Sequence, residues 1–324
     1  MKWAVVGGSG FVGSAVLKAL SNAGEETLSL SAPRLQCDAA SPADVHDAAD
    51  RLSAVVHQLA EQLSGAAVVV NAAGAAAPGS TDTAVLGGAN ALLPVLLMRA
   101  GKAAGVRRLI HLSSAAVQGH RPVLDETPDV APFSPYSRSK ALGEQSLAFN
   151  TSADDTPEGL DVVIVRATSV QGPDRPTTAA LARLAASPLA SVAAPGTAPS
   201  PVASVDALAE LVRILGSREG AVGNGSVPAI VLQPWERLTV RSVLESAGGT
   251  PLLLPSVLCR LVLRCAYAVS SLLGERLHGA VRRVELMWFG QDQVAGWTDR
   301  EGIVLPCRIS PILEAAGARR RRRS

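Results

Sequence analysis

A glycine-rich turn directly after the first apolar run is the feature that most restricts the fold of this chain. Residues 3–6 are apolar, and Gly7, Gly10 and Gly13 follow with the spacing G-x-x-G-x-x-G. Apolar residues then recur at helical spacing over residues 11–20. Glycine permits positive φ and a close approach of the backbone to a pyrophosphate, for which a Cβ leaves no room. The order strand, turn and helix therefore indicates a nucleotide-binding turn, although a glycine turn without a ligand fits the same letters.

The pattern of short apolar strands alternating with helices continues along the chain. We predict strands at residues 27–30, 66–70, 108–112 and 162–165, and helices at residues 41–63, 91–104, after residue 134, and at 206–215. Such alternation is typical of a parallel sheet that is covered by helices on both faces. We therefore predict an α/β protein with a Rossmann-type doubly wound parallel sheet and a smaller, mostly helical C-terminal substrate lobe.

The predicted sheet and lobe interleave along the chain. We assign residues 1–172 to the Rossmann domain, with a return segment at 201–235. Residues 173–200, which are rich in Ala, Ser and Pro, and residues 236–318 are assigned to the substrate-binding lobe. The five arginines within residues 319–324 predict a frayed, solvated tail, or else a contact with an anionic surface.

Composition and charge exclude several classes of function. Aromatic residues make up 3% of the chain, so a base-stacking nucleic-acid surface is not expected. The formal net charge is +2, and without the terminal arginine run it is 25 basic against 28 acidic residues, so the body is not a polyanion binder. The four cysteines show no metal-ligand spacing, which predicts reduced thiols, no metal and a cytoplasmic location.

No membrane span is expected, because no stretch of about 18 uncharged apolar residues occurs in the chain. Residues 251–274 are apolar but contain Arg260 and Arg264. These charges favour a packed amphipathic helix over a membrane anchor.

Tyr136 and Lys140 stand four residues apart in a chain that has only two tyrosines and four lysines. Ser134 and Pro135 precede them as a predicted N-cap and first helical residue, so the pair lies on one face of a helix near its start. A nearby ammonium favours ionisation of the phenol, and the two groups could then exchange a proton with a substrate hydroxyl or carbonyl. A surface tyrosine beside a solvated lysine is the alternative.

The end of the second predicted strand bears on the choice between NAD and NADP. An acid there would select NAD, whereas a base would accept the 2′-phosphate of NADP. Residues 28–31 lack an acid and Arg34 follows, which favours NADP.

Further motifs occur in a fixed order. They are the loop at residues 5–13, Asp38 after Cys37, the Asn-Ala-Ala-Gly loop at 71–74, and the Ser-containing strand end at 111–119. Together with Tyr136-x-x-x-Lys140 they resemble the extended short-chain dehydrogenase/reductase family, which includes nucleotide-sugar epimerases, dehydratases and reductases. The resemblance covers about residues 1–235. It implies a cofactor site at Gly7, Gly10, Phe11, Val12, Gly13, Arg34, Asp38, Ala72, Ala73, Gly74, Asn90, Tyr136 and Lys140.

The resemblance also implies catalytic roles. Tyr136 would be the acid/base, Ser114 would hold the substrate oxygen, and Lys140 would lower the Tyr136 pKa and bind the nicotinamide ribose. Gln118 and Thr168 would face the substrate. Gln118 and Gln171 stand where the family has Tyr, so the pocket departs from that of the sugar epimerases. Helix pairing into a homodimer is a further expectation of the resemblance.

Three functions remain open from the sequence. The first is an NAD(P)-dependent oxidoreductase or epimerase of a nucleotide sugar or a related small molecule. The second is a reductase of a steroid-like or isoprenoid-like substrate that rests on a bilayer through residues 251–274. The third is a non-catalytic NAD(P)-sensing protein, which has no need of Ser114, Tyr136 and Lys140. Dehydration is less favoured, because Arg138 and Ser139 stand between Tyr136 and Lys140 in place of acids, and the Ser-Ser-Ala stretch at 113–115 shows no Asp-Glu pair.

Overall fold

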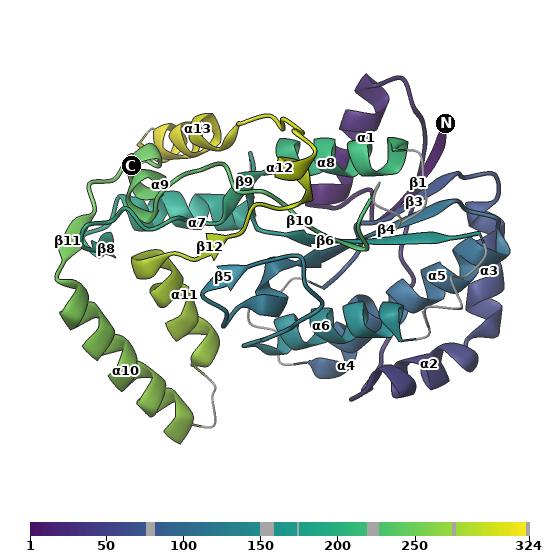
Figure 1. The fold of residues 1–324 in the computed structure, drawn as a ribbon, viewed down its shortest axis with the longest axis horizontal. Coiled ribbons are helices and arrows are strands. Elements are labelled where there is room, and N and C mark those ends of the chain that lie inside the picture. Colours follow the sequence, from purple (N-terminus) through teal and green to yellow (C-terminus); the bar gives the residue numbers. More distant parts are fainter. Residues whose placement is uncertain (76–81, 150–158, 174, 219–226, 274–276, 322–324) are drawn as a thin grey trace. The chain divides into compact units, whose positions relative to one another are not determined.

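The fold comes from a computed structural model that describes residues 1–75, 82–149, 159–173, 175–218, 227–273 and 277–321 (Figure 1). The chain forms two compact units. Unit 1 comprises Met1–Gly119, Glu126–Ala167 and Leu208–Leu232, and unit 2 comprises His120–Asp125, Thr168–Ala207 and Gln233–Ser324.

Unit 1 is built on a sheet of six strands, all parallel, in the order β10-β6-β4-β3-β1-β2. The strand order reverses between β1 and β3, and in such sheets ligands bind at the carboxyl ends of the strands beside that reversal. This confirms the predicted doubly wound fold. The strands are β1 (Lys2–Val6), β2 (Glu26–Leu30), β3 (Val68–Asn71), β4 (Arg108–Ser114), β6 (Asp161–Ala167) and β10 (Ile230–Leu232).

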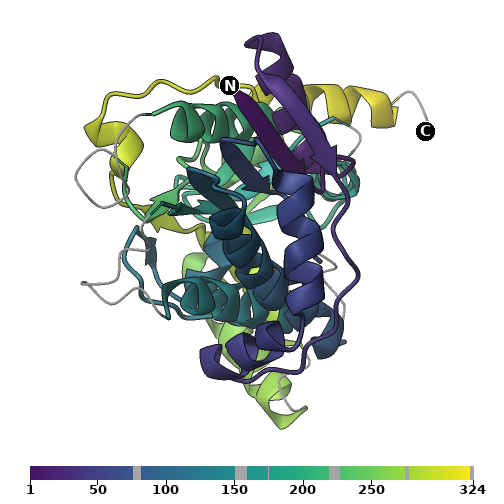
Figure 2. The same ribbon diagram turned by 90° about the vertical axis from the view of Figure 1, so that its right-hand side faces the viewer.

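Helices cover both faces of this sheet, and Figures 1 and 2 show them on opposite sides of the strands. The central strands are buried on both faces and therefore read as continuous apolar runs, such as Val68–Asn71. One face carries α1 (Phe11–Asn22) and α8 (Val205–Ser217). The other carries α2 (Pro42–Asp50), α3 (Ser53–Leu63), α4 (Thr83–Gly87), α5 (Leu93–Ala103) and α6 (Pro135–Ala148).

The helix predicted over residues 41–63 is wrong in its continuity. The structure has a break at Arg51 and Leu52, where Leu52 leaves helical geometry with φ −112° and ψ 33°. Leu52 packs against the core at this turn, so α2 and α3 can both place apolar residues on the same core cluster.

The helix predicted over residues 91–104 begins earlier, and its first part is irregular. A π-helical segment, η1 (Gly88–Leu92), joins α4 to α5, and Pro94 stands at the start of α5. Proline has no N–H for an i→i−4 hydrogen bond, which fits a local change of helical pitch at this point. Asn90 lies within this segment and is fully buried.

One helical stretch among the described residues, Thr83–Ala103, is long and apolar enough to cross a membrane by length and composition. The sequence had shown no such span. An 18-residue window within it has a mean hydropathy of 1.4, and 72% of that window is buried inside the protein, as is usual for a core helix.

Unit 2 is mostly helical, as predicted, with three small parallel strand pairs. Its core joins α7, α9 and α13 around Val192, Val243 and Leu313. The strand pairs are β5 (Val123–Leu124) with β12 (Asp292–Gln293), β7 (Ser169–Gln171) with β9 (Val202–Ser204), and β8 (Ser191–Ala193) with β11 (Leu252–Leu254). The helices are α7 (Pro176–Ala185), α9 (Val240–Ser246), α10 (Ser256–Leu272), α11 (His278–Phe289), α12 (Trp297–Arg300) and α13 (Ile309–Arg321).

Two segments of unit 2 differ from the sequence expectation. Helix α10 forms in the predicted place, but only Cys259, Leu263 and Ser270 of its residues are buried, so most of its apolar side chains face solvent. The predicted frayed tail is helical where it is described, since Arg319–Arg321 form the last turn of α13. Cationic side chains favour that position because the helix dipole is negative there. Residues 322–324 of the predicted tail lie outside the described residues.

Candidate active site

The glycine turn connects β1 to α1 in the predicted geometry. Gly7 has φ +82°, and a Cβ there would lie 2.7 Å from the Ala73 backbone nitrogen. A Cβ on Gly13 would collide with the Gly7 carbonyl oxygen. Both glycines are therefore required by close backbone contacts, and the turn lies against the loop that follows β3.

The residues of this turn fit the pyrophosphate of a dinucleotide. Gly10 is the N-cap of α1 and provides no side-chain cap, and the first turn of α1 contains no acid. Phe11 and Val12 are half-buried at the helix start. The positive end of the α1 dipole and its backbone N–H groups thus face the strand-order reversal of the sheet, which is the arrangement that binds phosphate.

The two residues predicted to read the adenosine end of a cofactor are accessible. Arg34 and Asp38 are both exposed in the segment that follows β2. Between them lies Cys37, which is buried and donates its backbone N–H to the Ala84 carbonyl at 2.9 Å. This bond fixes the segment to α4 and leaves both charged side chains directed outward.

The predicted loop of Ala72, Ala73 and Gly74 follows β3 and is held by Asn90. The Asn90 side chain accepts a hydrogen bond from the Ala75 backbone N–H at 3.2 Å and donates to the Ala75 carbonyl at 3.0 Å. Its amide also donates to the Ser139 hydroxyl at 3.0 Å. Asn90 therefore ties the loop after β3 to α6.

Helix α6 begins as the sequence predicts. Ser134 is the N-cap, its hydroxyl accepts the Ser137 backbone N–H at 3.1 Å, and the Ser137 side chain completes a capping box. Pro135 is the first helical residue. Tyr136 is half-buried in the first turn, and Lys140 follows one turn later on the same face.

Lys140 is almost completely buried, at 4% exposure, and its ammonium donates to the Leu112 carbonyl of β4 at 2.9 Å. A Cβ on Gly74 would lie 3.1 Å from the same nitrogen. The ammonium thus lies between the end of β4 and the loop after β3. Burial lowers the pKa of Lys140 from 10.5 to about 8, while Glu144 opposes that shift.

His111 and Asn71 form a buried pair beside this lysine that the sequence reasoning missed as a site. The Asn71 side-chain nitrogen lies 3.1 Å from His111 Nδ1, and both residues are fully buried. Burial first and the nearby Lys140 charge second hold the pKa of His111 well below its usual value, so the imidazole is neutral. The available signal was that Asn71 and His111 each stand near the end of a predicted strand. The structure pairs these strands in parallel and places the two residues at one register position.

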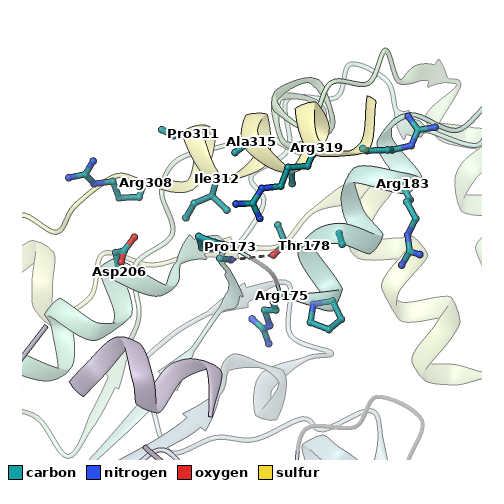
Figure 3. A pocket seen from close by; sticks show the side chains of 15 residues that line it. Pro173, Arg175, Thr178, Arg183, Asp206, Arg308, Pro311, Ile312, Ala315 and Arg319 are labelled. Atoms are coloured by element: carbon teal, nitrogen blue, oxygen red, sulfur yellow. Dashed lines mark hydrogen bonds between the residues drawn. The ribbon is translucent and has the colours of Figure 1, made fainter. Parts of the chain in front are cut away.

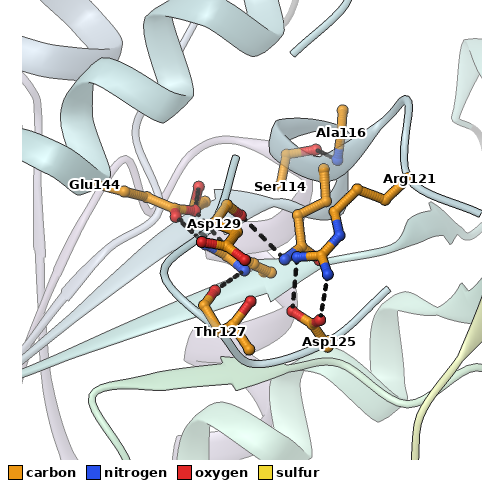
Figure 4. Close-up of polar contacts among 10 residues, drawn as sticks. Ser114, Ala116, Arg121, Asp125, Thr127, Asp129 and Glu144 are labelled. Atoms are coloured by element: carbon orange, nitrogen blue, oxygen red, sulfur yellow. Dashed lines mark hydrogen bonds and ion pairs between the residues drawn. The ribbon is translucent and has the colours of Figure 1, made fainter. Parts of the chain in front are cut away.

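Ser114 lies at the carboxyl end of β4, where its hydroxyl accepts the Ala116 backbone N–H at 3.2 Å. The serine is half-buried, and it is the N-cap of the short helix η2 (Ala115–Gln118). Ser114 and Lys140 are thereby both fixed to the end of one strand. Figure 4 shows Ser114 with Ala116 at this point.

The two residues predicted to face substrate have partners within their own units. Gln118 is fully buried, and its side-chain nitrogen donates to the Asp129 carbonyl at 3.0 Å in unit 1. Thr168, in unit 2, donates its backbone N–H to the Gln233 side-chain oxygen at 3.1 Å. Gln118 is therefore an interior residue, whereas Thr168 is half-buried.

A second group that sequence reasoning missed is a buried ion pair behind α6. The Arg166 guanidinium donates to Glu144 Oε2 at 2.7 Å and to the Thr127 carbonyl at 2.7 Å (Figure 4). The Ser113 hydroxyl donates to Glu144 Oε1 at 2.5 Å. Glu144 is four residues after Lys140, so helical spacing was the signal that could have found it. The pair fixes α6 to β4 and β6, and thus fixes the position of Lys140.

The fold and this turn define a dinucleotide-binding protein of the Rossmann type. Residues 3–204 match the model of the NAD dependent epimerase/dehydratase family. The chain belongs to that family, and it is an enzyme of this NAD-dependent type. The resemblance predicted from the ordered motifs is therefore confirmed.

Solved structures of nucleotide-sugar enzymes have the same fold. A UDP-glucuronic acid 4-epimerase from Bacillus cereus in complex with NAD is 18% identical, with a TM-score of 0.64 over 97% of each chain. The UDP-glucose 4-epimerase of Thermus thermophilus in complex with NAD is 22% identical, with a TM-score of 0.52 over 79% of this chain and 86% of that one.

A curated relative matches a shorter part of the chain. Sterol demethylase protein B of Methylococcus capsulatus (strain ATCC 33009 / NCIMB 11132 / Bath) is 36% identical over 83 residues. The match spans about a quarter of each protein, 24% of this chain and 24% of that relative.

Proposed function

We propose that this enzyme is an NAD(P)-dependent oxidoreductase or epimerase that acts at a carbinol or carbonyl carbon of a nucleotide sugar or a related small molecule. The observation that carries the proposal is the buried Lys140 ammonium, one helical turn from Tyr136 and beside the loop after β3. Structures of UDP-sugar epimerases in complex with NAD share this fold, which supports the substrate class.

Each of the three polar residues has a chemical role in this proposal. The Tyr136 phenolate takes the proton from the substrate hydroxyl during oxidation and returns it during reduction. The Lys140 ammonium, whose pKa of about 8 keeps it charged at neutral pH, favours the ionised phenol. The Ser114 hydroxyl donates a hydrogen bond to the reacting substrate oxygen. The nicotinamide ring, when bound, supplies the hydride chemistry.

A substitution at Tyr136 tests the reaction, and the chain offers a matched control because it has only one other tyrosine. Tyr136→Phe is expected to slow turnover by about 10²- to 10⁴-fold, as measured by nicotinamide absorbance with a panel of UDP-sugars. Tyr267→Phe is expected to keep the wild-type rate, since Tyr267 lies on α10 and donates to Glu285. Full turnover by Tyr136→Phe would refute the acid/base role.

The cofactor can be separated from the reaction type by two measurements. We propose that exposed Arg34 binds the 2′-phosphate of NADP, because no acid ends β2. Arg34→Ala should then weaken NADPH binding and leave NADH binding unchanged. If the wild type and Arg34→Ala bind NADPH with equal affinity, Arg34 does not bind the 2′-phosphate, and the cofactor is assigned as NAD. Mass spectrometry of the purified protein gives the second measurement, because retained NAD indicates epimerisation and an empty site that binds NADPH indicates a reductase.

The surface of α10 favours a second candidate, a reductase of a hydrophobic substrate at a bilayer surface. Val257, Leu258, Leu261 and Leu272 are 50–87% exposed, and α10 contains no acid. Exposed Arg260 and Arg264 lie on the same helix. An apolar face with arginines beside it is typical of helices that lie in the interface of an anionic membrane.

Flotation with phosphatidylglycerol vesicles distinguishes the two candidates. The bilayer candidate predicts that the wild type floats and that Leu258→Glu with Leu261→Glu does not. Val304→Glu is the control, because Val304 is 90% exposed in unit 2 outside α10. Failure of the wild type to float would exclude the bilayer candidate and leave the nucleotide-sugar proposal untouched.

A further inference from the structure

A cavity of about 740 Å³ lies within unit 2, between α7 and α13. Its volume falls in the range of small-molecule sites. The two helices pack against each other, and Figure 3 shows α13 above the cavity and α7 below it. The proposed catalytic residues Ser114, Tyr136 and Lys140 are not among the residues that line this cavity.

Each helix presents one continuous face to the cavity. The α13 residues that line it, which include Ile312, Ala315 and Arg319, recur at intervals of three and four, and Arg308 directly precedes the helix. Such spacing selects a single helical face. The floor is apolar and made of small side chains, Ala179 on α7 and Ala315 and Ala316 on α13, with Ile312 between them. The cavity is therefore a groove with an apolar floor.

Among the described residues, five arginines and one acidic residue border this groove. The arginines are Arg175, Arg183, Arg308, Arg319 and Arg320, and the acid is Asp206. Figure 3 shows Arg319 extending from α13 into the space above Thr178. Arg183 and Arg308 are exposed, and neither is in an ion pair among the described residues. The border of the groove is thus strongly positive.

The start of α7 adds to this positive end of the groove. Arg175 is the N-cap of the ten-residue helix, and its own side chain makes no capping hydrogen bond. The Thr178 hydroxyl accepts the Gly172 N–H at 3.2 Å and donates to Gln171 Oε1 at 2.8 Å, so Thr178 fixes the turn that enters α7. The helix dipole there has the same sign as the arginines.

We propose that this groove binds an anionic amphiphile, a phosphate-type group joined to a short apolar body. The arginines pair with the phosphate oxygens, and the alanine-lined floor receives the hydrocarbon. No aromatic side chain is among the described residues that line it, so the groove offers nothing on which a nucleobase stacks. The proposal is independent of the reaction at Tyr136.

Titration calorimetry of the full-length protein with octyl phosphate tests the groove. Octyl phosphate is expected to bind at least 10-fold more tightly than either inorganic phosphate or octanol. Arg183→Gln and Arg308→Gln should each weaken it at least 5-fold. Ala179 is exposed on the floor of the groove, so Ala179→Trp should fill the apolar part of the groove. This variant should abolish octyl phosphate binding although all the arginines remain.

Arg283→Gln is the matched control, because Arg283 is an exposed arginine on α11 that does not line the groove. It should bind octyl phosphate as the wild type does. Equal affinities in wild type, Arg183→Gln and Arg308→Gln would overturn the proposal, and so would binding of phosphate as tight as that of octyl phosphate. Competition by phosphatidylglycerol vesicles would assign the ligand to a lipid, and absence of competition to a free phosphate ester; both outcomes keep the groove as the site.

Discussion

Unit 1 and unit 2 distribute charge and apolar surface in opposite ways. Unit 1 has 13 basic and 17 acidic residues and buries Lys140, Glu144 and Arg166 beside parallel strands. Unit 2 has 17 arginines, no lysine and 11 acidic residues, and it exposes the leucines and valines of β11 and α10. The excess positive charge and the exposed apolar surface therefore occur in the same unit.

The difference between the two units shows when an apolar run in the sequence predicts buried side chains. In unit 1 a strand such as β3 has neighbours on both sides and helices on both faces, so every apolar side chain is buried. In unit 2 the helix α10 has contacts on one narrow stripe only. An apolar run hence predicts burial only where the topology surrounds it, and elsewhere it marks a surface available for binding.

The largest expected contrast concerns ion pairs. Glu144→Ala should lower the free energy of unfolding by about 3–5 kcal/mol, because it deprives the buried Arg166 of its carboxylate. Glu210→Ala, which removes the partly exposed i,i+3 partner of Arg213 in unit 1, should cost less than about 1 kcal/mol. Urea denaturation measures both, and equal losses would mean that burial does not set the cost.

Truncation of leucines sharpens the comparison of the two units. Leu109→Ala, in the fully buried strand β4, should cost about 2–5 kcal/mol. Leu272→Ala, 87% exposed on α10, should change stability by less than about 0.5 kcal/mol. Thermal or urea unfolding compares them, and a loss above about 2 kcal/mol at Leu272 would show that α10 is covered in solution.

The buried ammonium predicts an unusual pH dependence. The pKa of Lys140 is about 8 in the folded protein and 10.5 in the unfolded chain, so between these values the unfolded chain binds more protons. The unfolding free energy therefore rises with pH across that window, by up to about 3 kcal/mol. Lys140→Met should abolish this rise, as seen in urea midpoints at pH 7.5, 8.5 and 9.5. Parallel profiles in the two proteins would contradict it. Turnover of the wild type should fall above about pH 8, because the ammonium is lost.

The smallest expected effect is one in which the two units should agree. Ser134 caps α6 in unit 1 and Thr239 caps α9 in unit 2, and both have a complete capping box. Ser134→Ala and Thr239→Ala should each cost about 1 kcal/mol of unfolding free energy. Only Ser134→Ala should also reduce turnover, because only α6 carries Tyr136 and Lys140.

Local signals in the sequence predicted most of unit 1. The strand–glycine turn–helix order at Gly7 to Gly13 and the Ser134-Pro135 helix start are both present in the structure. The break at Leu52 and the π-helical segment around Asn90 were missed, because both depend on how a helix meets the core rather than on periodicity. The same holds for the Glu144–Arg166 pair, whose members lie 22 residues apart on α6 and β6.

The sequence by itself determined five of the six strands of the sheet, the glycine turn after β1 and the position of Tyr136 and Lys140 on one helical face, because these depend on backbone sterics and on apolar and helical spacing over a few residues. The sixth strand, β10, was not predicted. Only the tertiary structure decided that Lys140 is desolvated against β4, that Gln118 is enclosed, and that the apolar side chains of α10 and the arginines of α13 remain at the surface. Burial is a property of what surrounds a residue, and the residues that surround these positions come from distant parts of the chain.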